Sequence, residues 1–111
     1  MKEHVHIGEW EERIVTVPAG GVNTFTLTCT HERAINVFQQ SSGVATVTVR
    51  FINPPNGRFG VFRTDVMAAG APIAYQIEFP PRSLQFHCAA VAAQTLVFWI
   101  CRVKTGTEES E

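Results

Sequence analysis

Apolar and polar residues alternate one by one through much of this chain, and this period of two constrains its fold more than any other feature. In residues 23–29, Phe25, Leu27 and Cys29 alternate with three threonines. Residues 45–52 repeat the pattern, with an apolar residue at every second position from Ala45. Successive side chains of a β-strand point to opposite faces of a sheet, so each stretch predicts a strand with one buried face. No stretch carries the period of a helix of three turns.

Further stretches rich in β-branched and aromatic residues predict strands, and clusters of Gly, Pro, Asn and Ser separate them. Asn56-Gly57 is the strongest hairpin-turn signal. The sequence therefore predicts an all-β fold, a single antiparallel β-sandwich of about eight strands with jelly-roll or related Greek-key topology. An immunoglobulin-like sandwich is the alternative, although its Cys, Trp, Cys framework is missing. The further strands are expected at 13–17, 33–40, 58–65, 73–79, 83–90 and 95–103.

Length and charge indicate one domain with distinct ends. The chain has 111 residues, enough for one core. Both ends are rich in glutamate, whereas residues 13–103 hold seven arginines against Glu32, Asp65 and Glu78. We expect an N-terminal arm over residues 1–12, a β-sandwich over 13–103 and an acidic flexible tail over 104–111. The formal net charge of −1 argues against direct nucleic-acid binding, while a basic body suits an acidic partner.

Targeting and redox signals favour an intracellular origin. The first residues lack the apolar run of a signal peptide, so we do not expect secretion. Three cysteines at scattered positions indicate reduced thiols rather than a disulfide framework. The most apolar stretch, residues 89–103, contains Gln94 and Thr95 and ends in a segment with Arg102, so it is too short and too polar to span a bilayer.

The sequence gives only weak evidence for a metal site. His4 and His6, followed by Glu11, have a spacing similar to part of the first metal motif of cupins, but they lie next to the first residue and no later motif supplies a ligand. We treat a cupin-like metal protein as the less favoured hypothesis, because two imidazoles on an arm are more often solvated.

A zinc site and a catalytic site are disfavoured as well. Cys29 with His31, and His87 with Cys88, contain the right atoms for zinc, but adjacent strand residues face opposite sides of a sheet. Small buried cysteines explain these positions better. No nucleophile elbow, pair of catalytic carboxylates or phosphate-binding loop is present, so we expect no enzyme activity, no metal and no cofactor.

The last predicted strand, residues 95–103, is apolar on both faces. Leu96, Phe98 and Ile100 share one face, and Val97 and Trp99 lie on the other with Cys101 and Val103. In an antiparallel sandwich only one face of a strand meets the core, so something else must cover the second. Two alternatives for covering this second face are equally favoured: another subunit, or the N-terminal arm of the same chain, acting through Trp10.

Several other aromatic residues and arginines are candidates for an interface. Phe38 has the parity opposite to Ile35 and Val37, and either Val61 or Phe62 faces outward according to the register of their strand. Aromatic residues and arginine commonly anchor protein interfaces. The candidate interface residues are Trp10, Phe38, Arg58, Phe62, Arg63, Leu96, Phe98, Trp99 and Arg102.

The length, the dense Thr and Val strands and the closing Leu96-x-Phe98-x-Ile100 strand resemble the small jelly-roll decoration, cement or staple proteins of tailed-phage capsids. The resemblance covers roughly residues 13–103. It implies a virion protein on the capsid surface, made in the host cytoplasm, that bridges neighbouring major capsid protein subunits and forms a homodimer or another homo-oligomer. It implies no membrane partner.

A carbohydrate- or receptor-binding module of a phage tail is the competing function. Sugar sites combine exposed aromatic rings with amide and acidic side chains. Tyr75 with Gln76, or Phe38 with Gln39 and Gln40, offer such pairs.

Overall fold

The computed structural model is all-β, and it describes residues 2–30, 32–53 and 58–108, with side chains described from 9 to 104 outside the gaps at 31 and 53–59. No helix occurs among these residues, so none of the described chain is a helix able to cross a membrane. The strands are β1 (Lys2–Val17), β2 (Gly21–Thr28), β3 (Glu32–Ser41), β4 (Ala45–Asn53), β5 (Arg58–Met67), β6 (Ile73–Glu78), β7 (Ser83–Ala90) and β8 (Gln94–Glu108).

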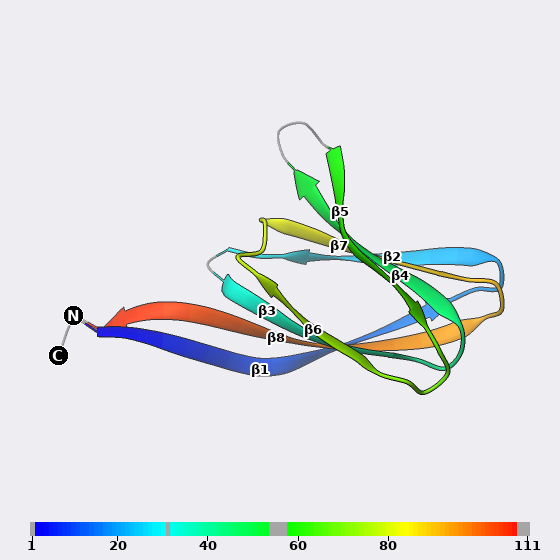
Figure 1. The fold of residues 1–111 in the computed structure, drawn as a ribbon, viewed down its shortest axis with the longest axis horizontal. Coiled ribbons are helices and arrows are strands. Elements are labelled where there is room, and N and C mark those ends of the chain that lie inside the picture. Colours follow the sequence, from blue (N-terminus) through cyan, green and yellow to red (C-terminus); the bar gives the residue numbers. More distant parts are fainter. Residues whose placement is uncertain (1, 31, 54–57, 109–111) are drawn as a thin grey trace.

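Two four-stranded antiparallel sheets face each other, one in the order β1-β8-β3-β6 and the other in the order β2-β7-β4-β5 (Figure 1). The chain passes from one sheet to the other at each connection except the hairpin between β4 and β5. This interleaved order is that of a jelly roll, which confirms the predicted fold class.

The core lies between the sheets and follows the predicted parity. Phe86 on β7 stacks on Phe25 at 4.7 Å between ring centroids, and Phe98 meets Phe25 edge-on at 5.0 Å. Stacked and edge-on pairs are the favoured arrangements of aromatic rings in cores. The fully buried positions include Leu27, Ile35, Val37, Val47, Val49, Ile77, Leu84, Phe86, Cys88, Leu96, Phe98 and Ile100.

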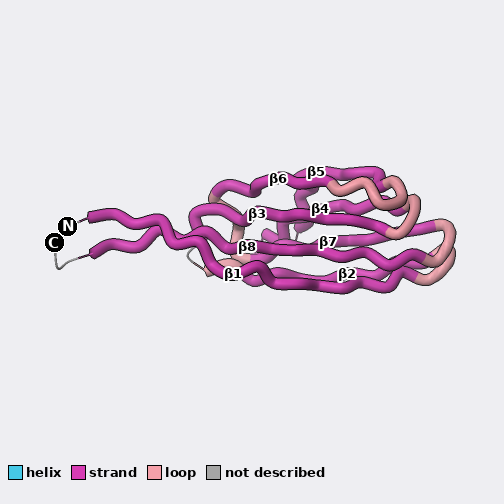
Figure 2. The backbone as a smooth tube through the Cα atoms, turned by 90° about the horizontal axis from the view of Figure 1, so that it is seen from below, coloured by secondary structure: helices cyan, strands magenta, loops and turns pink. Residues whose placement is uncertain are grey.

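The two ends of the chain form a ribbon rather than an arm and a tail. Residues 2–7 of β1 pair with residues 103–108 of β8, and the resulting two-stranded ribbon projects from one end of the sandwich (Figures 1 and 2). β3 accompanies β8 only as far as Lys104, which pairs with Glu32. The expected boundaries at 12 and 104 therefore differ from the structure, because backbone pairing between the two polar ends extends both strands. Residues 1 and 109–111 lie outside the described residues.

Candidate functional site

The strongest candidate site is the side of the β1-β8-β3-β6 sheet that faces away from the other sheet, called the outer face below. Cross-strand pairing sets its residues in rows, of which the central two are Glu12–Trp99–Phe38–Ala74 and Trp10–Cys101–Asn36–Gln76. These residues alternate with the buried positions of the same strands, because neighbouring side chains point to opposite faces. The outer face comprises Trp10, Glu12, Ile14, Ala34, Asn36, Phe38, Gln40, Ala74, Gln76, Glu78, Val97, Trp99, Cys101 and Val103.

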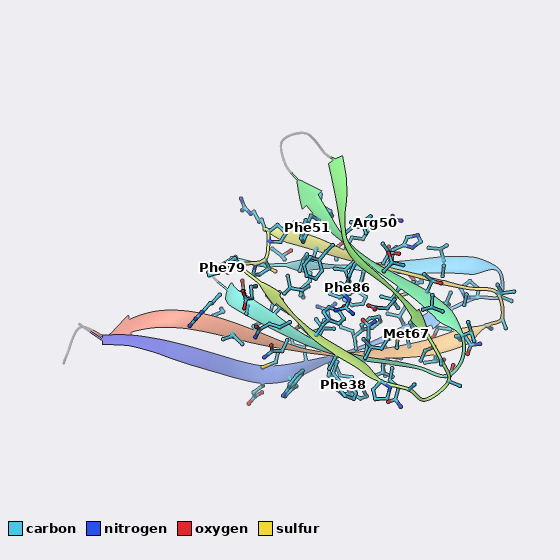
Figure 3. All side chains as sticks on the ribbon, viewed as in Figure 1. Phe38, Arg50, Phe51, Met67, Phe79 and Phe86 are labelled. Carbon is cyan, nitrogen blue, oxygen red and sulfur yellow. The ribbon has the colours of Figure 1, made fainter. Side chains whose placement is uncertain are left out.

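An aromatic pair occupies the centre of the outer face. The ring centroids of Phe38 and Trp99 lie 5.3 Å apart, and the indole Nε1 of Trp99 donates a hydrogen bond to the Glu12 carboxylate at 3.2 Å. Figure 3 shows Phe38 on the outer side of its sheet, whereas Phe86 lies between the sheets. Side chains on both neighbouring strands, Phe38 of β3 and Glu12 of β1, therefore contact Trp99.

Exposed apolar side chains flank this pair on β1. Trp10 is 54% exposed and Ile14 is 63% exposed, and Ile14 pairs with the half-buried Val97 of β8. Cys101 lies beneath these larger neighbours and is 1% exposed. Single exposed apolar residues are common, but a contiguous set centred on two aromatic rings is typical of an interaction surface. This side of β8 is the second apolar face that the sequence predicts.

Polar groups surround the apolar centre. Gln76 Nε2 donates to Asn36 Oδ1 at 2.8 Å, and Gln40 Nε2 donates to the Gly70 carbonyl at 3.0 Å. At the end of the face nearest the ribbon, a hollow is lined by Arg33, Ala34, Gln76, Glu78, Phe79 and Val103. An apolar centre with a polar rim is the usual anatomy of a protein interface.

Two of the predicted interface residues belong to the core instead. Leu96 and Phe98 are 0% exposed and point toward the other sheet, so the prediction that they contact a partner is wrong. The alternation alone could not say which face of the strand is inside. Trp10, Phe38 and Trp99, which are separate candidates in the sequence, lie together on the outer face.

Arg102, another predicted interface residue, forms hydrogen bonds within the chain. Its Nε donates to Glu11 at 2.7 Å, and its Nη1 donates to Glu32 at 3.0 Å and to the Thr28 carbonyl at 2.8 Å. This cluster closes the end of the core where the ribbon begins. Burial would raise the pKa of Glu32, but hydrogen bonds from the backbone N–H groups of Glu32 and Thr30 and from Arg102 outweigh it and lower that pKa.

The predicted candidates on β5 lie on the other sheet. A bulge where Val49 and Arg50 of β4 pair with β5 changes the alternation, so both Val61 and Phe62 are exposed, Phe62 at 40%. The ring centroids of Phe62 and Phe51 lie 5.5 Å apart. Arg63 forms two hydrogen bonds with Asp65 at 2.7 and 2.8 Å. Its guanidinium also lies 4.0 Å from the centre of the Tyr75 ring. These contacts bring Phe62 and Arg63 to the side of the sandwich, away from the outer face, and the Arg58 side chain lies outside the described residues.

The structure gives the metal hypotheses no support within its described part. Cys88 is 0% exposed in the core and His87 lies on the opposite side of β7, as their adjacency predicts. Burial raises the pKa of Cys88 to about 12, and burial and the nearby Glu32 raise that of Cys29 to about 11, so both thiols stay protonated. Among the described residues no three His, Cys, Asp or Glu side chains gather as metal ligands. The side chains of His4, His6 and His31 lie outside that part.

No protein-family model matches the sequence, and no curated protein matches it. Among solved structures, the chain is similar to a mitogen derived from Yersinia pseudotuberculosis, with a TM-score of 0.62 and 10% identity over 84% of this chain and 85% of that chain. It is similar to the PBSX exported protein XepA, with a TM-score of 0.66 and 12% identity over 96% of this chain and 38% of that chain.

A third similar structure is that of Bacillus endospore appendages, described as a family of disulfide-linked pili, with a TM-score of 0.60 and 14% identity over 96% of this chain and 93% of that chain. At these identities the similarities show the fold alone. The chain is a β-sandwich module whose fold occurs in proteins of several kinds.

Proposed function

We propose that this chain is a structural, non-catalytic virion protein that binds the exterior of a capsid shell and staples neighbouring major capsid protein subunits. Its partners are then the major capsid protein and further copies of itself on the shell, and its location is the capsid surface after synthesis in the host cytoplasm. The observation that carries the proposal is the outer face, an apolar surface with Phe38 and Trp99 at its centre and Trp10 and Ile14 exposed beside them.

Two properties suit this surface to binding protein. Trp99 is held by Phe38 and Glu12 on regular strands, so binding orders few side chains and costs little conformational entropy. The ribbon of β1 and β8 extends the module to a long axis of 55 Å, which increases the distance between the points it can contact. A module with one rigid contact face and one projecting ribbon can reach two neighbouring subunits.

Stapling would act by linkage. A protein that binds only the assembled shell shifts the assembly equilibrium toward the shell and raises its resistance to heat. The test compares capsid shells stripped of this chain with the same shells after it is added back, by calorimetry or light scattering during heating. We expect the midpoint of shell disruption to rise with added protein and to saturate. Equal midpoints with and without the protein would exclude stapling.

Carbohydrate binding is a second candidate for the same face. Phe38 and Trp99 lie beside the amides of Asn36 and Gln40, a combination that suits sugar rings and hydroxyls. The predicted pair of Tyr75 with Gln76 is wrong, because Tyr75 packs against the core while Gln76 lies on the outer face. Gln39 does not contribute beside Phe38 either, because it is 0% exposed and accepts a hydrogen bond from the Tyr75 hydroxyl at 3.0 Å. Binding on a glycan array that is lost on Trp99→Ala, in a variant that remains folded, would favour this function over stapling.

A further inference from the structure

We propose that the outward side of the β2-β7-β4-β5 sheet binds an acidic polysaccharide, whose carboxylate or sulfate groups are held by Arg50 and His87. This side is called the hydroxyl face below, and its two central rows are Thr26–Gln85–Arg50–Val61 and Thr24–His87–Thr48–Thr64. Figure 3 shows Arg50 on the outer side of its sheet, whereas Phe86 lies in the core. The hydroxyl face and the outer face belong to different sheets, so this ligand is independent of stapling.

Arg50 is a half-buried cation without an acid beside it. Three arginines are half-buried in the described chain: Arg50, Arg63 and Arg102. Arg63 bonds to Asp65, and Arg102 bonds to Glu32. No hydrogen bond or ion pair joins the Arg50 guanidinium to any residue that the structure describes. Since charges withdrawn from water are normally compensated by a partner, Arg50 is placed for an anion that comes from outside the chain.

His87 places a second basic group beside the first. Thr48 of β4 pairs with His87, and Arg50, two positions along the same strand, pairs with Gln85. The side chains of Arg50 and His87 are therefore diagonal neighbours on one face. Like charges so placed destabilise a sheet unless an anion lies between them. Among the described residues of the four strands the one acid is Asp65, which points to the other side of β5.

Hydroxyl and amide groups surround the two basic side chains. Thr24 and Thr26 are exposed on β2, Thr64 is exposed on β5, and the Gln85 amide lies between Thr26 and Arg50. Each hydroxyl donates and accepts hydrogen bonds, as sugar hydroxyls do, so the rows match an extended sugar chain.

The composition of the hydroxyl face disfavours other macromolecules. A nucleic acid requires a larger basic patch than one arginine and one histidine. Protein interfaces are anchored by aromatic residues, and the two central rows contain none. A neutral sugar would also need a ring on which to stack, whereas an acidic sugar is held through its charge. An acidic polysaccharide is the ligand that satisfies both the cations and the hydroxyls.

Binding of an anion is linked to the protonation of His87. Burial, and to a smaller extent Arg50, lower the pKa of His87 in the free chain. The described groups that face it from the neighbouring strands are Thr24 of β2 and Thr48 and Arg50 of β4, of which Arg50 alone is charged. A bound sulfate favours the protonated imidazole and raises this pKa. Affinity therefore increases as the pH falls through the pKa of His87 in the complex.

Calorimetric titration of the full chain with dextran sulfate and with unsubstituted dextran, at about 0.15 M salt, tests the ligand. We expect saturable binding of dextran sulfate and at least about tenfold weaker binding of dextran. Arg50→Met should raise the dissociation constant for dextran sulfate at least about tenfold. Arg33→Met is the matched control, because Arg33 is exposed on β3 of the other sheet. No binding by the parent chain, or equal binding by Arg50→Met, overturns the site.

A double substitution separates a polysaccharide from a simple anion. Thr24→Val with Thr26→Val keeps the β-branched shape and removes two hydroxyls. We expect it to weaken dextran sulfate binding by about three- to tenfold and to leave the binding of inorganic sulfate unchanged. An unchanged affinity for dextran sulfate would mean an adventitious ion only. Polyglutamate that the parent chain binds as tightly as dextran sulfate would assign the face to acidic protein segments, against the polysaccharide.

Two further measurements test the state of the basic pair. Because Arg50 has no acid beside it, Arg50→Met should leave the urea midpoint of the free chain unchanged or raise it, and a large fall would show that the chain itself compensates this charge. Nuclear magnetic resonance follows the titration of His87, whose signal is the one missing from His87→Gln. We expect a higher pKa with dextran sulfate than without it, and an unchanged or lower value contradicts the role of His87.

Discussion

Replacing Arg102 by methionine tests how the chain closes the end of its core. The guanidinium of Arg102 joins Glu11 of β1, Glu32 of β3 and the Thr28 carbonyl at the end of β2. The Glu32 side chain is 1% exposed, whereas that of Arg102 is 24% exposed. Methionine keeps most of the aliphatic stem and removes the charge, so the loss of packing is small.

The size of the stability loss in Arg102→Met depends on how exposed Glu32 and Glu11 are. Removing one partner of a buried ion pair costs about 3–5 kcal/mol, because the other charge remains buried without compensation. Glu32 keeps the Thr30 N–H at 2.6 Å and has Lys104 at 4.0 Å, which lowers this cost. The bond to Glu11 adds little, since Glu11 is 36% exposed and such pairs contribute about 0–1 kcal/mol. We expect Arg102→Met to lower the free energy of unfolding by about 3 kcal/mol at neutral pH.

Urea unfolding followed by tryptophan fluorescence measures this change. With a denaturant dependence of about 1.5 kcal/mol per molar urea, the midpoint falls by about 2 M. Arg82→Met is the control, because Arg82 is exposed at the same end of the sandwich, and we expect a change within about 0.5 kcal/mol. The pKa of Glu32 is lowered in the folded chain, so its contribution is present above its ordinary pKa and is lost as the pH falls through the folded value. The difference between parent and Arg102→Met must therefore shrink in acid. A change below about 0.5 kcal/mol at neutral pH would refute the account of this cluster.

Four further predictions concern the interior. Phe98→Ala should lower the free energy of unfolding by about 3–5 kcal/mol in the same assay, because it opens a cavity in the aromatic core. Since burial raises their pKa to about 11 and 12, Cys29 and Cys88 should resist alkylation at mildly basic pH until the chain unfolds, and rapid labelling of the folded chain would contradict their burial. Tyr75 is the single tyrosine, and burial raises its pKa, so tyrosinate absorbance should appear only on unfolding in strong base. Tyr75→Phe should lower the free energy of unfolding by about 1–2 kcal/mol, because it leaves the buried side-chain oxygen Oε1 of Gln39 without its donor.

The sequence predicts the sandwich because the signal for strands is local. Alternation marks the strands, turn residues mark the ends of most of them, and parity assigns inward positions such as Ile35, Val37, Leu84 and Phe86. It also predicts that β8 carries two apolar faces, one of which is the core and the other the outer face. These features depend on residues close together in the chain, so a single sequence is enough to predict them.

The remaining features depend on contacts between distant segments. The bond between Arg102 and Glu32 joins residues 70 positions apart, and no local pattern predicts that Glu32 is buried. The bulge at Phe62 breaks the alternation on β5, which is why both registers fit the sequence there. The sequence does not predict the ribbon, because its polar composition is typical of flexible ends as well as of exposed strands.

Co-sedimentation with capsid shells tests the central claim, that the outer face is the surface through which this module holds other proteins. The measurement compares binding isotherms on stripped shells of the parent chain, the double variant Trp10→Ser with Ile14→Ser, and the control Val66→Ser, since Val66 is 70% exposed on the other sheet. The account predicts saturable binding by the parent and the control, and at least about tenfold weaker binding by the double variant, because Trp10 and Ile14 are exposed on the outer face. Binding that is equal for all three folded proteins, or no binding by the parent, would contradict it.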